Sequence, residues 1–244
     1  MLLLNPLNIL ILCPEFIKLM VDTHKATMNF LRNNRFLILL VMLVSLFTIT
    51  SFIGNPYAAD LYVTINYTLM LISGLYAFSE VKNFLKSTTL FFLFAIFIYW
   101  IEFFHPQFQL VYTIRPLITA LVLVFLLIMT LRSILLAGSI TKNVIFGSLC
   151  GYILIGYIGA FLTMAIALLY PGSYNIPGEI QTMDAIYFSF VTMTTLGYGD
   201  LLPLAEESRA LAILLSILGP MYVAILIAML VGKYSSQPDI KPKQ

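Results

Sequence analysis

Six long apolar segments run through this sequence and limit the folds open to it more than any other feature. A bilayer core about 30 Å thick is crossed by about 20 helical residues. Charged residues make up only 10% of the chain, too few to cover the surface of a water-soluble globule. The sequence therefore predicts an all-α integral membrane protein with six transmembrane helices, over residues 36–53, 61–78, 90–104, 117–131, 144–169 and 210–231, the fourth extended back to near Gln109.

Lysine and arginine are unevenly distributed over the loops between these segments. With both termini in the cytoplasm, only Arg115 and Arg209 of the 13 basic residues fall on the opposite side. Because cytoplasmic loops are rich in lysine and arginine, we expect a multi-pass protein of the cell (inner) membrane with both termini cytoplasmic. The cytoplasmic set is Lys18, Lys25, Arg32, Arg35, Lys82, Lys86, Arg132, Lys142, Lys233, Lys241 and Lys243.

A shorter segment, residues 183–195, lies between the fifth and sixth predicted helices. It is mildly apolar, too short to span a bilayer, and preceded by a loop that contains Pro171-Gly172 and Pro177-Gly178. Both flanking helices reach the outer face in the predicted topology. We therefore expect a re-entrant segment that enters and leaves the membrane from outside.

The sequence Thr-Leu-Gly-Tyr-Gly-Asp at 195–200 ends this segment. With the aromatic residues that precede it from 187 onward, it resembles the pore loop of potassium channels, with Leu196 in place of a valine. The resemblance implies an ion-selectivity filter whose backbone carbonyls replace the water around K+. It implies a homotetramer, since one filter strand cannot surround an ion. The implied K+ ligands are Thr195, Leu196, Gly197, Tyr198 and Gly199, with Asp200 at the outer mouth.

Residue types within this motif suit that role. Successive carbonyls can face an ion only if the backbone alternates between unusual conformations, and Gly197 and Gly199 permit the positive φ angles this requires. Thr195 can add its hydroxyl at the inner end. The side chains of Leu196 and Tyr198 would point away from the ion and brace the filter.

Residues 184–194 are expected to form a pore helix, capped at its N-terminus by Thr182 or Asp184. The partial negative charge at its C-terminal end would favour a cation. Known relatives carry tryptophans at 187 and 188, and some carry glutamate at 191. Because Phe188 lacks a donor and Val191 a carboxylate, we expect Asp200 to be held less tightly here. The pore-helix residues are Asp184, Tyr187, Phe188, Val191, Thr192 and Thr194.

The last apolar segment resembles the inner helix of small prokaryotic ion channels of the two-helix-pore type. Gly219 and Pro220 lie mid-helix, where proline removes a hydrogen bond and bends the chain. This bend is either a gating hinge or a static kink. We divide the chain into an N-terminal cytoplasmic or interfacial segment (1–35), a four-helix membrane domain (36–132), a pore domain (133–234) and a short cytoplasmic tail (235–244).

The four-helix domain stands where voltage-gated channels carry their sensor. Sensor helices bear repeated basic residues, but the fourth helix here has no charge between Arg115 and Arg132. We therefore expect little intrinsic voltage sensing. Arg115 is instead expected to pair with Glu102 or Asp60, which share the outer side.

Passive, selective K+ permeation is the function that these patterns favour. A non-selective cation channel, a non-conducting regulatory subunit and, less well matched, a potassium transporter subunit are the alternatives. The sequence contains no catalytic constellation, so we expect no enzyme activity and no cofactor beyond the permeant K+. The net charge of +2 gives no reason to expect nucleic-acid binding. The expected partners are the lipid bilayer, three further copies of the chain and an unidentified regulatory ligand or partner.

Overall fold

The computed structural model describes residues 22–23, 33–77, 85–105 and 109–235. Seven helices lie in these residues, and their only β-structure is an isolated antiparallel bridge between Tyr174 and Pro203. The predicted N-terminal segment 1–35 and tail 235–244 lie almost wholly outside the described part. The helices are α3 (Arg35–Thr50), α4 (Pro56–Ala77), α5 (Leu85–Phe104), α6 (Gln109–Leu136), α7 (Lys142–Leu169), α8 (Thr182–Met193) and α9 (Glu206–Ser235).

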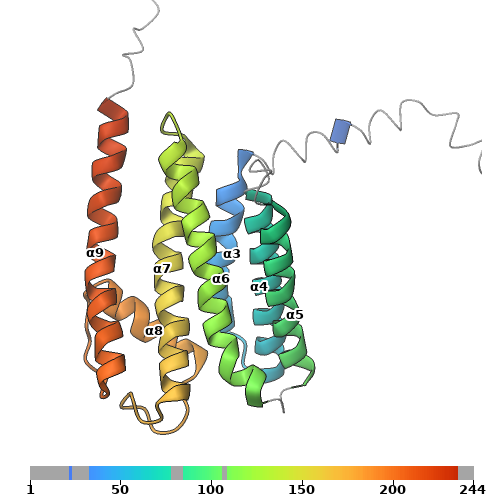
Figure 1. Ribbon diagram of the computed structural model, residues 1–244, viewed down its shortest axis with the longest axis vertical. Coiled ribbons are helices and arrows are strands. Elements are labelled where there is room, and N and C mark those ends of the chain that lie inside the picture. The colour runs from blue at the N-terminus through green and yellow to red at the C-terminus, as the bar shows by residue number, and fades with distance from the viewer. Residues whose placement is uncertain (1–21, 24–32, 78–84, 106–108, 236–244) are drawn as a thin grey trace, which may run out of the picture.

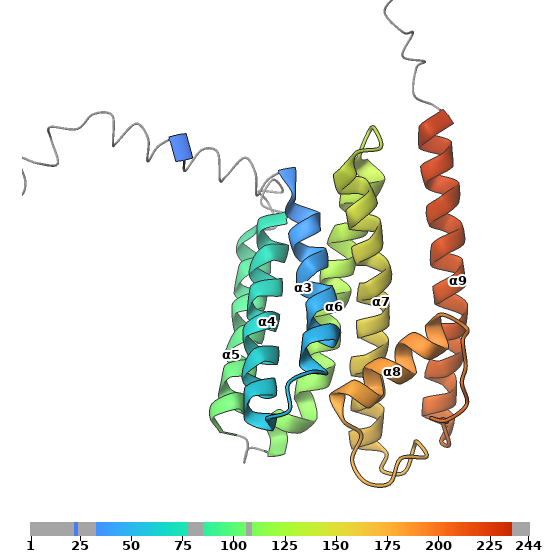
Figure 2. The same cartoon turned by 180° about the vertical axis from the view of Figure 1, so that it is seen from behind.

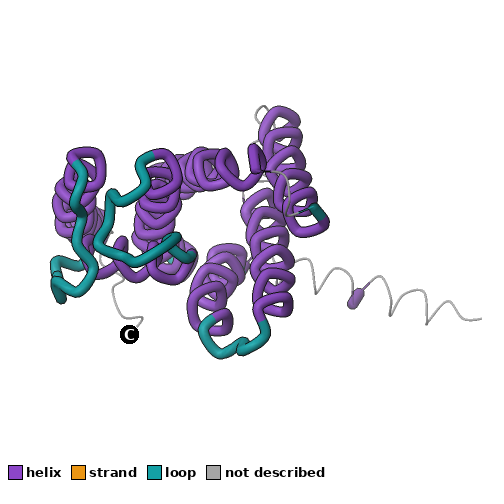
Figure 3. Tube along the Cα trace, turned by 90° about the horizontal axis from the view of Figure 1, so that it is seen from below, coloured by secondary structure: helices purple, strands orange, loops and turns teal. Residues whose placement is uncertain are grey.

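Six of these helices run side by side and alternate in direction along the chain (Figures 1 and 2). The lower end of the bundle, as drawn in Figure 1 and so called below, holds the ends of α3, α5 and α7 and the beginnings of α4, α6 and α9. Figure 3 looks along the helices from this end and shows α9 on the opposite side of the bundle from α4 and α5. The beginning of α3 and the end of α9 therefore share the upper end.

All six predicted apolar segments correspond to helices. Helices α4, α6, α7 and α9 are long and apolar enough to cross a membrane. Helix α3 has 16 residues, and at about 1.5 Å per residue it falls short of a bilayer core. The apolar part of α5, Thr89–Phe104, is also shorter than a membrane span. The chain is therefore an all-helical, multi-pass membrane protein.

Local residue chemistry accounts for where the helices begin. Pro56 is the first residue of α4, a position that needs no backbone N–H donor. The side chain of Asn55 accepts a hydrogen bond from the Tyr57 amide at 3.0 Å. Helix α7 begins after Thr141, whose hydroxyl accepts from the Val144 amide at 3.4 Å. Asparagine and threonine are residue types that favour helix N-termini.

The apolar core of the four-helix part, α3 to α6, is continuous with that of α7 and α8. Tyr67 of α4 and Tyr99 of α5 stack with ring centroids 3.9 Å apart, among buried leucines and phenylalanines of all four helices. Asn66 is also buried, and its amide donates to Ser45 Oγ at 2.7 Å and to Tyr62 Oη at 3.2 Å. Asn66 therefore ties α4 to α3.

Helix α7 is the central helix and contacts α3, α6, α8 and α9. Its small residues allow the close approach that membrane helices use in place of a hydrophobic driving force. A Cβ at Gly159 would lie 2.3 Å from Ser189 Oγ, and one at Gly156 would lie 2.4 Å from the Phe190 ring. Both neighbours belong to α8, so α7 sets the position of this short helix.

The upper ends of α6 and α9 are joined by Lys233. Its ammonium group donates to the carbonyl oxygens of Ile134 at 2.8 Å, Leu135 at 3.1 Å and Ala137 at 2.6 Å. These carbonyls lie at the C-terminal end of α6, where backbone acceptors lack helical partners and the dipole favours a cation. The contact links the four-helix part to the end of α9.

Candidate functional site

Helix α8 begins two residues earlier and ends one residue earlier than the predicted pore helix. Its N-cap is Gln181, whose backbone N–H donates to the Asp184 carboxylate at 3.1 Å. Asp184 thus contributes to the cap as expected, but from the third helical position. Thr182, the other predicted cap, is the first residue of the helix.

Contacts along α8 fix it against the rest of the chain. Ser189 Oγ donates to the Gly156 carbonyl at 2.6 Å. The buried Phe188 ring meets Tyr174 edge-on, with centroids 5.1 Å apart. Met193, the last residue, is fully buried. Val191 and Thr192 are half-buried, and the Thr194 hydroxyl donates back to the Phe190 carbonyl at 2.7 Å.

The backbone after α8 alternates in handedness. φ is 59° at Thr195, 56° at Gly197 and 81° at Gly199. The predicted positive φ at the two glycines is confirmed. Thr195 was missed, and it is the only non-glycine residue with positive φ in the described part of the chain. Since such residues are uncommon and strained, Thr195 marks a backbone that its surroundings hold in place.

Backbone hydrogen bonds hold the first half of this stretch. The Val191 carbonyl accepts from the amides of Leu196 at 3.0 Å and Gly197 at 3.2 Å, and the Thr192 carbonyl accepts from the Thr195 amide at 3.0 Å. The C-terminal turn of α8 therefore supports the stretch directly. Leu196 is 55% exposed in the single chain.

Tyr187 connects α8 to both Tyr198 and Asp200. The rings of Tyr187 and Tyr198 stack at 6.4 Å with an interplanar angle of 6°. Tyr187 Oη donates to Asp200 Oδ2 at 2.6 Å, and the Leu201 amide donates to Asp200 Oδ1 at 3.0 Å. Phe188 lacks a donor, but its neighbour Tyr187 supplies one, so Asp200 is held by a hydrogen bond that the sequence analysis did not foresee.

The same hydrogen bond changes the acidity of both partners. It favours the charged carboxylate, so it lowers the pKa of Asp200 below its usual range. Donation to a carboxylate, followed by desolvation, raises the pKa of Tyr187 to about 12. Asp200 therefore stays ionised to lower pH than an ordinary aspartate.

The loops on either side of the site are tied together. Asn175 Nδ2 donates to the Asp200 carbonyl at 3.0 Å, and its Oδ1 accepts from the Leu202 amide at 2.6 Å. The Ser173 carbonyl accepts from the Leu204 amide and from Ser208 Oγ, both at 2.8 Å. Sequence reasoning missed this link, because an asparagine in a loop gives no signal of its distant partner.

Gly219 and Pro220 lie inside α9. A Cβ at Gly219 would lie 2.0 Å from the carbonyl oxygen of Met193. The glycine therefore lets α9 pass directly against the C-terminal end of α8. A gating hinge at Gly219 and Pro220 stays a prediction, and the structure adds a packing reason for the glycine.

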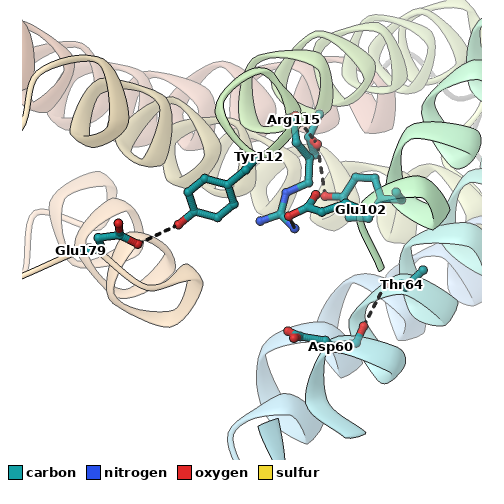
Figure 4. A network of polar contacts seen from close by, with 8 residues as sticks. Asp60, Thr64, Glu102, Tyr112, Arg115 and Glu179 are labelled. Carbon is teal, nitrogen blue, oxygen red and sulfur yellow. Dashed lines mark hydrogen bonds and ion pairs between the residues drawn. The ribbon is translucent and has the colours of Figure 1, made fainter. Parts of the chain in front are cut away.

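The predicted pairing of Arg115 is confirmed with Glu102. Arg115 Nη1 lies 2.7 Å from Glu102 Oε1, and both side chains are largely buried. Figure 4 shows this ion pair beside Tyr112, whose hydroxyl donates to Glu179 Oε2 at 3.2 Å. The second contact joins the lower end of α6 to the loop before α8.

The fold and the site together define a class of protein. It is a multi-pass membrane protein in which a helix too short to span, followed by a stretch of alternating handedness, lies between two spanning helices. Residues 148–235, which run from within α7 to the end of α9, match the family model described as "Ion channel".

Three plant proteins whose names include potassium are similar to this chain in sequence. The chain is 41% identical over 58 residues to "Two-pore potassium channel 1" of Arabidopsis thaliana. It is 39% identical over 66 residues to "Two pore potassium channel b" of Oryza sativa subsp. japonica, and 34% over 70 residues to "Two pore potassium channel a" of that plant.

These similarities are local. The matched stretches cover 23%, 26% and 28% of this chain, and 16%, 16% and 20% of the three relatives. The chain thus spans a fifth or less of each relative. No solved structure matches the chain.

Proposed function

We propose that the chain is one of four identical subunits of a potassium-selective channel, with residues 195–199 as its filter. The observation that carries this proposal is the positive φ at alternate residues, Thr195, Gly197 and Gly199, within a Thr-Leu-Gly-Tyr-Gly-Asp sequence. Carbonyl rings that replace the water around K+ need such a backbone. The ion-channel match and the names of the plant relatives support the same function.

Assembly into a tetramer is supported by what the single chain leaves uncovered. Leu196 and Tyr198 are 55% and 67% exposed, although the filter role requires them to be braced. Helix α9 packs mainly on α7 and α8 and exposes a series of large apolar side chains: Ile213, Leu214, Ile217, Leu218, Met221, Val223, Ile225, Ile227 and Val231. Neighbouring copies would cover the filter side and part of α9.

In the proposed orientation the lower end of the bundle faces outside and both termini are cytoplasmic. Asp60, in the first turns of α4, and Glu179, which contacts the beginning of α6 through Tyr112, belong to the lower end. Lys142 begins α7 and Lys233 lies in the last turn of α9, both at the upper end. This polarity agrees with the positive-inside rule. All six of α3 to α7 and α9 would then cross the membrane, the short α3 together with the residues that flank it, with α8 re-entrant and its negative dipole end directed at the ion.

Purified protein in liposomes tests this function. We expect K+ flux well above Na+ flux, an elution volume that corresponds to a tetramer, and little dependence on membrane potential. Gly197→Ala should abolish flux, because alanine resists a φ of 56°. Gly232→Ala, at an open site on α9, is the matched control and should conduct.

Either of two results would contradict the proposal and favour a different function. Equal K+ and Na+ flux would indicate a non-selective cation channel. A folded tetramer without flux, in liposomes where a known channel conducts, would indicate a regulatory subunit.

A further inference from the structure

A cavity of about 1050 Å³ lies at the lower end of the bundle, away from the filter. Its walls come from α3, α4, α5, α6 and α7 and from residues 177–183 before and at the start of α8. Drug-sized ligands occupy pockets of about 300–1,000 Å³. The volume is therefore ample for an organic molecule.

The cavity carries net negative charge. Three carboxylates line it, those of Asp60, Glu102 and Glu179, against one guanidinium, that of Arg115, which leaves −2. Figure 4 shows Asp60 across from the Arg115–Glu102 pair, with Glu179 on the far side of Tyr112. A cation that enters this space would meet acceptors on several sides.

One of these acceptors is buried and incompletely satisfied. Arg115 binds Glu102 Oε1, and Glu102 Oε2 has no hydrogen-bond partner among the described residues. The hydroxyl of Tyr67, a residue only 1% exposed that also lines the cavity, is likewise without a partner there. Buried polar atoms are normally paired, so these two atoms, together with Arg115 Nε, leave hydrogen-bonding capacity beside the cavity that no described residue meets.

Aromatic rings form much of the remaining wall. The Arg115 guanidinium carbon already lies 5.6 Å from the Tyr99 ring centroid, within the range of a cation–π contact. Aromatic faces next to carboxylates suit an ammonium group attached to an apolar body. The aromatic lining residues are Tyr57, Tyr67, Tyr99, Phe103, Tyr112 and Phe161.

A divalent metal ion fits this cavity less well. Within the described residues no group of three or more histidine, cysteine, aspartate or glutamate side chains is placed to hold a metal. Calcium takes six to eight oxygen ligands at about 2.3–2.6 Å. Three carboxylates on α4, α5 and the loop before α8, around a large space, do not offer such a shell.

We propose that this cavity binds a monovalent organic ammonium ion with an aromatic or branched apolar body. The ammonium group lies among Asp60, Glu102 and the aromatic rings, and the apolar body fills the space toward Met164 and Ile186. Because the walls include both α6 and the residues that begin α8, an occupant contacts the four-helix part and the pore part at once. This site goes beyond ion conduction, and binding does not require flux.

Benzyltrimethylammonium and its uncharged carbon isostere, neopentylbenzene, test the proposal. Full-length protein in lipid nanodiscs is titrated with the cation by calorimetry, with empty nanodiscs as the blank and the isostere as competitor. We expect saturable binding that the isostere displaces poorly. Asp60→Asn should weaken binding about fivefold, the effect of one partly exposed charge, whereas Glu206→Gln, at an exposed carboxylate outside the cavity, should not change it.

Two further variants locate the site. Val63→Phe, which fills the cavity without changing charge, should reduce binding, and Gly197→Ala should leave it intact. Equal displacement by the isostere would overturn the proposal in favour of an apolar or lipid-filled cavity. Loss of binding in Gly197→Ala would indicate that the cation binds in the filter. Heat no greater than that from empty nanodiscs would show that the cavity binds no ammonium ion, and would also overturn the proposal. A channel that fails to conduct but binds the cation would refute only the proposed function.

Discussion

Replacement of Gly219 by alanine is the sharpest test of how α8 is held. The ideal Cβ at this position lies 2.0 Å from the carbonyl oxygen of Met193, 2.8 Å from its Cγ and 2.9 Å from its carbonyl carbon. Two of these three atoms belong to the backbone at the end of α8, so no side-chain rotation can make room. Either α9 or the end of α8 must move by about 1.4 Å or more to restore an ordinary van der Waals contact.

The expected change in the free energy of unfolding is the difference between two opposing effects. Alanine gains about 1 kcal/mol over glycine inside a helix. Overpacking that shifts backbone costs typically about 1–3 kcal/mol, occasionally more. The difference is about 0–2 kcal/mol, and because the clash is with backbone atoms we expect Gly219→Ala to destabilise the protein by an amount near the upper end, about 2 kcal/mol. We also expect lower K+ flux, because the displaced residues lie directly before the proposed filter.

Gly232→Ala is the matched control, since it lies in the same helix with no atom within 4 Å of its Cβ. It should stabilise the protein by up to about 1 kcal/mol and leave flux unchanged. Unfolding of both variants in detergent and flux in liposomes provide the comparison. If Gly219→Ala were as stable and as active as Gly232→Ala, the packing argument would be refuted. Unchanged stability with altered channel opening would favour a hinge.

Three further substitutions each remove one contact described above. Tyr187→Phe removes the hydrogen bond that lowers the pKa of Asp200, so the carboxylate should protonate, and acid should reduce K+ flux, at higher external pH than in the wild type. Lys233→Met should cost about 1–3 kcal/mol in unfolding free energy, because charged hydrogen bonds to the end of α6 are lost. Arg115→Gln should cost about 2–3 kcal/mol, because it leaves the largely buried Glu102 carboxylate without its ion-pair partner, and Glu102→Gln in the same chain should recover part of that loss.

Each of these has a control on the same helix or of the same residue type. Tyr170→Phe, at an exposed tyrosine near the end of α7, should leave the pH dependence of flux unchanged. Lys142→Met and Arg132→Gln, at exposed basic positions, should each change stability by less than about 0.5 kcal/mol. The role of Tyr187 would be contradicted if acid reduced K+ flux at the same pH in Tyr187→Phe as in the wild type. The role of Lys233 would be contradicted if Lys233→Met were as stable as Lys142→Met.

Helix positions were predictable because they depend on local signals. Continuous apolar runs marked each helix to within about five residues at either end. The filter stretch was predictable for the same reason, since Gly197 and Gly199 permit a conformation that their neighbours resist. The ion pair of Arg115 followed from topology, which placed Glu102 and Asp60 on the same side of the membrane as Arg115.

Contacts between distant segments were not predictable in this way. The donor to Asp200 was sought at Phe188 and lies at Tyr187, one residue away, because the orientation of α8 decides which side chain reaches the loop. The approach of Gly219 to Met193 depends on how closely α9 crosses α8. The positive φ of Thr195 depends on the surroundings of the filter stretch, and nothing in a threonine signals it.

In the proposed tetramer, these contacts divide the control of the proposed filter between one subunit and its neighbours. Asp200 is fixed from within the chain, by Tyr187, by the Leu201 amide and by Asn175. Leu196 has a fixed backbone but a mostly exposed side chain. In the proposed tetramer, the outer mouth is therefore set by each subunit alone, whereas the diameter at Leu196 is set by packing between subunits. Substitutions at Leu196 should then alter selectivity and tetramer stability together, while substitutions at Asn175 should affect the mouth and leave assembly intact.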